Sequence, residues 1–112
     1  MESILNSIKK KLGMTENYVH FDDDVIMCIN SAFMVLTQLG IGPANGFSIT
    51  SDFEKWNQFL EDGVNLESVK SYVYFKCRLE FDPPTQTSLL ESMERQAREL
   101  EWRLQVQADL NN

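Results

Sequence analysis

Residues 65–84 read NLESVKSYVYFKCRLEFDPP, and this stretch decides the fold. Its apolar side chains recur at helical spacing in two adjacent stripes, which are Leu66, Val69, Val73 and Cys77, and then Tyr72, Phe75 and Leu79. Asn65 is a suitable N-cap, and Asp82-Pro83-Pro84 ends the helix because the residue before a proline disfavours the α conformation. Two adjacent stripes therefore predict a central helix, from Leu66 to Phe81, that is packed on more than one side.

Apolar periodicity predicts four further helices around this one. They run from Ser3 to Leu12, from Asp23 to Leu39, from Asp52 to Leu60 and from Thr87 to Gln107. Ser51 and Glu54 form a capping box before the third of them, and Trp56 falls on its apolar face, as core aromatic residues do. Since no stretch alternates long enough to build a sheet, the expected fold class is all-α, a small bundle of about five helices with a long C-terminal helix.

The last predicted helix has a narrow apolar seam and a long charged surface. The seam consists of Leu90, Met93, Ala97, Leu100 and Leu104, and the charged surface offers three acid-first pairs four residues apart, which are Glu91 with Arg95, Glu94 with Arg98, and Glu99 with Arg103. Such a helix suits packing against a partner helix, from this chain or from a neighbour. The tail from Ala108 to Asn112 lacks a helix-stabilising pattern and is expected to stay loose until something binds it.

The segment from Gly40 to Thr50 is the one long break in the periodicity, and its three glycines and one proline mark a loop. Exposure of its apolar residues Ile41, Phe47 and Ile49 to water would be unfavourable, so the loop either folds back on the core or reaches a partner. Together with Trp102, which lies off the seam, and Leu110 in the tail, these three residues are the candidate subunit or partner interface.

The length and the net charge of the chain limit the classes of function that the protein can have. The 112 residues suit one helical domain spanning 1–112. A net charge of −7 argues against binding nucleic acid through its phosphates, which requires a basic face. The N-terminus places its lysines after a short apolar stretch, unlike a signal peptide, and no later run approaches the roughly 20 apolar residues of a membrane span.

The residue types that usually act in catalysis or metal binding are expected to have structural roles in this sequence. His20, the single histidine, has no nucleophile motif or second ligand near it and is expected on a surface loop. The triplet Asp22-Asp23-Asp24 lacks the spacing of a calcium loop and is expected to cap the second helix and to stabilise it through the helix dipole. Cys28 and Cys77 are expected to be reduced, as small core residues. The sequence therefore predicts no catalytic, metal-binding or nucleic-acid-binding residue, no cofactor and no enzyme activity.

Several strings, together with the order of elements, resemble a known family across most of the chain. They are Asp24-Val25-Ile26 opening a helix, Leu39-Gly40-Ile41-Gly42-Pro43 closing it, Trp56 in a short third helix, Val69-Lys70-Ser71-Tyr72-Val73-Tyr74 leading to Phe81-Asp82-Pro83-Pro84, and Leu100-Glu101-Trp102-Arg103-Leu104 near the end. The sequence resembles the short, acidic, all-helical head-tail connector (adaptor) proteins of long-tailed bacteriophages and prophages. None of these strings is a catalytic signature.

The resemblance implies a structural part of the virion neck that is made in the host cytoplasm and has no membrane association. Proteins of this kind form a ring, typically a dodecamer, under the portal; the ring extends the DNA channel and docks the next neck or stopper protein. The acidic charge is compatible with this role, because an acidic wall lets DNA pass without tight binding. The alternative is a small helical phage-encoded regulatory protein that binds a host protein through an amphipathic helix.

Overall fold

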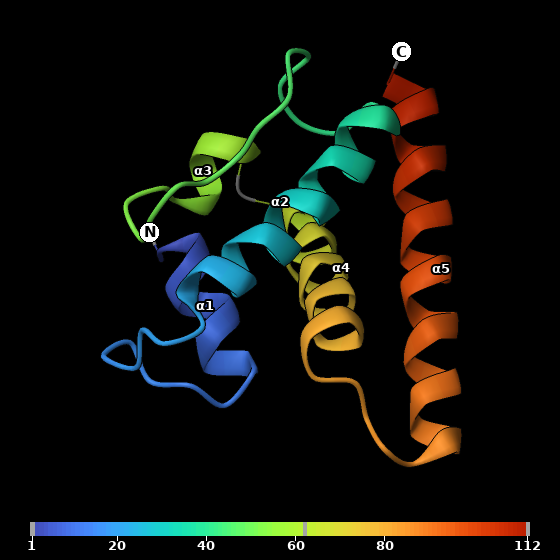
Figure 1. The fold of residues 1–112 in the computed structure, drawn as a ribbon. Coiled ribbons are helices and arrows are strands. Elements are labelled where there is room, and N and C mark those ends of the chain that lie inside the picture. Colours follow the sequence, from blue (N-terminus) through green and yellow to red (C-terminus); the bar gives the residue numbers. More distant parts are fainter. Residues whose placement is uncertain (1, 62, 112) are drawn as a thin grey trace.

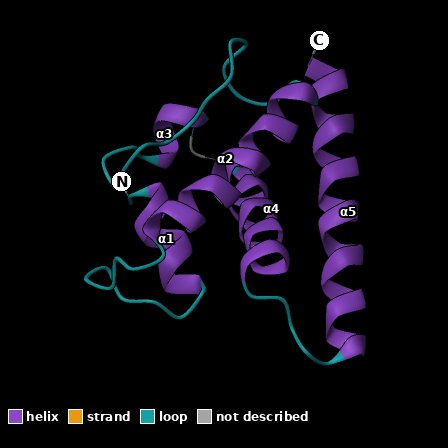
Figure 2. Ribbon diagram, viewed as in Figure 1, coloured by secondary structure: helices purple, strands orange, loops and turns teal. Residues whose placement is uncertain are grey.

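The computed structural model describes residues 2–61 and 63–111, and this part of the chain folds into five helices (Figures 1 and 2). They are α1 (Ile4–Lys11), α2 (Asp22–Gln38), α3 (Trp56–Phe59), α4 (Val64–Phe81) and α5 (Thr87–Asn111). The extended pairing in the described residues is a single bridge between Ser3 and Lys55. The all-α class and the long C-terminal helix are thus confirmed.

Helix α4 is central, as its two stripes predict. It packs against α2 and α5 on different sides and also contacts α1, while α1 and α3 lie on the far side of the molecule from α5 (Figure 1). Its fully buried side chains are Leu66, Val69, Tyr72, Val73 and Cys77. The prediction of the N-cap was wrong, because Gly63 takes that position and Asn65 lies within the first turn.

Trp56 is the centre of a second part of the core, where α1, α2 and α3 meet. Its indole is fully buried, and Nε1 donates a hydrogen bond of 2.8 Å to Oγ of Ser7 on α1. Phe33 of α2 lies between the rings of Trp56, Phe47 and Phe59, with centroid distances of 6.1, 5.3 and 4.6 Å. The core role expected for Trp56 is therefore confirmed.

The predicted start of the third helix at Asp52 was wrong, because α3 has only four residues and begins at Trp56. The Glu54 carboxylate does accept hydrogen bonds from the backbone N–H groups of Thr50 and Ser51, and Ser51 Oγ accepts one from Phe53 N–H. These bonds close a turn instead of capping a helix. Phe53, which lies in this turn, is 81% exposed.

The loop from Gly40 to Thr50 folds back on the core. Ile41 and Ile49 are buried, and the side-chain amide of Asn30 makes two hydrogen bonds with the backbone of Ile49, of 2.8 and 3.0 Å. Gly42 has a φ of 86°, and a Cβ at this position would collide with the ring of Phe59. Of the two roles left open for this loop, the structure shows the first.

Helix α5 continues to Asn111, so the expected loose tail was wrong for the described residues 108–111. Ala108 is buried in the core, which anchors the last turns of the helix even though the sequence there has no strong helix signal. The seam is confirmed, with Met93, Ala97 and Leu104 buried and Leu90 and Leu100 partly buried against α4. Of the three predicted acid-base pairs, Glu99 with Arg103 lies within ion-pair distance, at 2.6 Å.

Candidate subunit interface

The outer face of α5 carries a strip of exposed apolar side chains, Trp102, Val106 and Leu110, which we call the α5 strip. The three are four residues apart and share one face of the helix. Trp102 is two residues from both Leu100 and Leu104, which places it about 200° around the helix from the seam. Trp102 is 64% exposed and Leu110 is 75% exposed. The α5 strip therefore faces away from α4 and takes no part in this chain's core.

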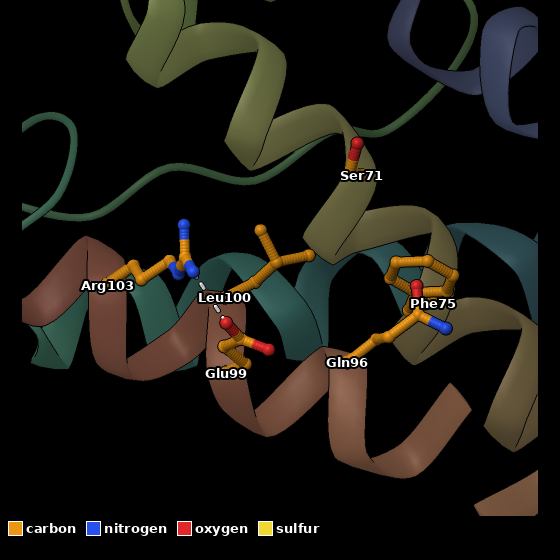
Figure 3. A pocket seen from close by; sticks show the side chains of 6 residues that line it. All are labelled: Ser71, Phe75, Gln96, Glu99, Leu100 and Arg103. Carbon is orange, nitrogen blue, oxygen red and sulfur yellow. Dashed lines mark hydrogen bonds and ion pairs between the residues drawn. The ribbon is translucent and has the colours of Figure 1, made fainter. Parts of the chain in front are cut away.

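A groove of about 400 Å³ runs between α4 and α5, beside the α5 strip. Figure 3 shows its walls, with Phe75 of α4 and Leu100 of α5 pointing into the space between the two helices. The remaining lining residues are Ser71, Gln96, Glu99 and Arg103. The groove combines an apolar floor with a charged edge formed by the Glu99–Arg103 ion pair, which is typical of a surface that receives a partner's side chain.

Helix α2 exposes a second apolar surface, formed by Met27 and Met34, which we call the α2 strip. The two methionines are one heptad apart, on the face of α2 opposite its buried residues. They are 69% and 59% exposed. A shallow hollow of about 470 Å³ lies between them, lined also by Asp23, Ile26, Asn30 and Ser31.

The five residues predicted as a candidate interface do not form one surface. Ile41 and Ile49 are buried in this chain's own core and Phe47 is partly buried against Phe33, so these three offer little or no surface to a partner. Trp102 and Leu110 do share an exposed face, and their role in an interface stays a prediction. Sequence reasoning missed Met27 and Met34, although their seven-residue spacing on the polar side of α2 could have revealed them.

A buried ion pair joins α1 to α2. Lys9 is 1% exposed, and its ammonium lies 2.8 Å from Oδ1 of Asp22 and donates a hydrogen bond of 3.1 Å to the backbone oxygen of Glu16. Of the two roles expected for the aspartate triplet, the capping role was wrong, because Phe21 is the N-cap residue and no side chain caps α2. Asp22 instead neutralises Lys9, while Asp23 and Asp24 are exposed in the first turn, where the helix dipole favours acids.

The two cysteines, Cys28 and Cys77, are free thiols, and their surroundings do not activate them. Burial, and then the charge of Glu80, raise the pKa of Cys28 to about 11. Burial raises the pKa of Cys77 further. Both thiols therefore stay protonated at neutral pH, and neither is an activated nucleophile.

Other reactive groups are sparse in the part of the chain that the structure describes. His20 is exposed in the loop before α2, as expected, with its ring edge against Phe21. Residues 2–61 and 63–111 contain no group of three or more His, Cys, Asp or Glu side chains placed to hold a metal ion. Within the same residues, no helix is long and apolar enough to cross a membrane.

Comparison with known proteins identifies the family. A family model described as phage connector protein matches residues 4–111, a span that contains all five helices. No curated protein and no solved structure gave a match. The chain therefore belongs to the phage connector protein family, a structural family of the bacteriophage virion, and serves as a head-tail connector.

Proposed function

We propose that the protein forms a ring under the portal, extends the DNA channel and docks the next neck or stopper protein. The observation that carries this proposal is the α5 strip, a set of apolar side chains that the protein's own core leaves uncovered. Trp102 is a side chain of the kind that dominates protein–protein interfaces. An exposed apolar face on a small protein is a typical mark of assembly.

The charge of the chain supports a role beside DNA without adhesion to it. The chain has 17 acidic and 10 basic residues. A ring of such subunits repels phosphates and releases few counterions on contact with DNA, so the duplex can slide through the channel. In this proposal the protein has no catalytic activity, because its role is to hold two parts of the particle together.

A deletion of the gene, complemented from a plasmid, tests the proposed function. Without the protein we expect DNA-filled or leaking heads together with free tails, because the joint between them is missing. Wild-type complementation should restore infectious particles. Phe53→Ala should do the same, since Phe53 is exposed but lies outside the α5 strip, whereas the pair of changes Trp102→Ala and Leu110→Ala should not.

One result would overturn the proposal. If particles lacking the protein carry attached tails and remain infectious, the connector ring is not needed for the joint. The better account would then be a regulatory protein that binds a host protein, and a stable complex of one copy of the chain with one host protein should be recoverable from infected cells.

A further inference from the structure

The two exposed apolar strips lie on different sides of the subunit. Helices α2 and α5 pack against different sides of α4 (Figure 1). Each strip is on the face of its helix opposite the buried side chains. A closed ring joins each subunit to the next through two different surfaces. The α2 strip and the α5 strip are two such surfaces.

The two strips also match in spacing and in charge. On α2, Asp23 precedes Met27 by four residues and Met34 by eleven, and on α5 Arg98 precedes Trp102 by four residues and Leu110 by twelve. At 1.5 Å per residue the two patterns extend over about 16 and 18 Å. A parallel alignment that sets Asp23 beside Arg98 therefore also sets Met34 beside Leu110.

The charges at the start of this alignment are complementary. Helix α2 carries three aspartates and no basic residue, and Asp23 is exposed. Arg98 is exposed on α5 and has no acidic group within ion-pair distance among the described residues. Among residues 2–61 and 63–111, neither group has an ion-pair partner, and the neighbouring subunit would supply one.

The shapes are complementary as well. The hollow extends along α2 from the level of Asp23 to that of Met34, and in this alignment Trp102 lies level with Met27, within that length. Methionine side chains adapt their shape and make favourable contacts between sulfur and aromatic rings. An indole that fills this hollow would be buried at the centre of the contact, which is where the side chains that dominate an interface usually lie.

We infer that a second copy of this chain is the partner of these surfaces: the α2 strip of one subunit receives the α5 strip of the next, with Trp102 in the hollow beside Met27 and Asp23 paired with Arg98. This inference rests on the proposed ring, and it identifies the residues that would join one subunit of the ring to the next. In Figure 1 α5 runs upward and α2 runs obliquely upward, so a neighbour rotated relative to this subunit can present its α5 along α2.

Charge reversal tests the pairing. Sedimentation velocity of the purified protein with purified portal measures assembly as the fraction of the chain in the ring. Asp23→Arg and Arg98→Asp should each reduce association about tenfold or more, and the variant carrying both changes should recover it, because every contact then has an arginine facing an aspartate. The double variant keeps the net charge of the wild type. Glu2→Arg, which changes an exposed acid outside both strips, is the matched control and should assemble normally.

A disulfide experiment tests the geometry independently of binding strength. Met34→Cys and Leu110→Cys, each in a separate chain, should form cross-linked dimers only when the two are mixed, and one chain with both changes should give a ladder of multimers. Dimers of Leu110→Cys alone would show a symmetric contact and overturn the inference. Trp102→Ala should weaken assembly by about 30-fold, and Phe53→Ala should not.

The outcomes separate the inferred contact from the ring itself. If the wild type assembles on the portal and the Asp23, Arg98 and Trp102 variants assemble equally well, the contact is wrong while the ring stands. If the wild type forms no multimer with the portal, both the contact and the proposed function are wrong.

Discussion

The ion pair between Lys9 and Asp22 provides a quantitative test of how α1 is held to α2. Asp22→Asn leaves the Lys9 ammonium, which is 1% exposed, without a counter-charge. Removing one partner of a buried pair costs about 3–5 kcal/mol, a large part of the 5–15 kcal/mol that stabilises a typical domain. Lys9→Met should cost less, about 2 kcal/mol, because the Asp22 side chain is 26% exposed and only its Oδ1 is buried.

The assay is urea unfolding of the two single variants and of the variant with both changes. The double variant leaves no uncompensated charge, so its loss of stability should fall short of the sum of the single losses by at least about 2 kcal/mol. Lys10→Met is the matched control, because Lys10 is the exposed neighbour on the same helix, and it should lie within about 0.5 kcal/mol of the wild type. If Asp22→Asn is as mild as this control, or if the two single losses simply add, the reasoning is refuted.

Three further predictions concern single groups. Tyr72→Phe removes the hydroxyl that donates a 2.8 Å hydrogen bond to Glu101. In urea titrations this change should lower the free energy of unfolding by about 1.5–3 kcal/mol. A loss below about 0.5 kcal/mol would contradict the role of this bond in linking α4 to α5. Burial alone would raise the pKa of Glu54, but hydrogen bonds, mainly from the backbone of Thr50 and of Glu54 itself, outweigh it and lower that pKa below 4.5. The stabilising effect of Glu54 is therefore complete above about pH 4.5 and declines as the pH falls through the lower folded-state pKa, so the difference in melting temperature between wild type and Glu54→Gln should be present at pH 7 and shrink toward pH 3. With a pKa of about 11 against 9.0 for an ordinary thiol, Cys28 should react with iodoacetamide at pH 8 about 100-fold more slowly in the folded protein than in urea, and a folded rate equal to the rate in urea would refute its burial.

The helices could be predicted from the sequence because apolar periodicity records which face is buried. This worked best for α4 and α5, where the stripes are long and the stop at Asp82-Pro83-Pro84 is unambiguous. It failed at Asp52, because a serine followed three residues later by a glutamate stabilises a tight turn as well as a helix start. It also failed beyond Gln107, where the contact of Ala108 with the core extends α5.

The candidate interface was harder to predict, because an exposed apolar residue and a buried one look alike in a sequence. Ile41 and Ile49 were read as possible partner contacts, yet Asn30 draws their loop onto the core through hydrogen bonds across 19 positions in the sequence. Met27 and Met34 were missed, although their seven-residue spacing was a signal, and the packing of α2 on α4 shows that their face is uncovered. The burial of Lys9 could not be predicted from the sequence, since its partner Asp22 belongs to a different helix.

The central claim, that this chain is a ring-forming part of the virion neck, is tested most directly by cryo-electron microscopy of intact particles at the joint between head and tail. We predict a closed ring of copies of this chain directly below the portal, with α4 of each subunit between its α2 and α5 and a channel wide enough for duplex DNA. A neck whose density is fully accounted for by other proteins, in particles from which this chain is absent, would contradict the claim.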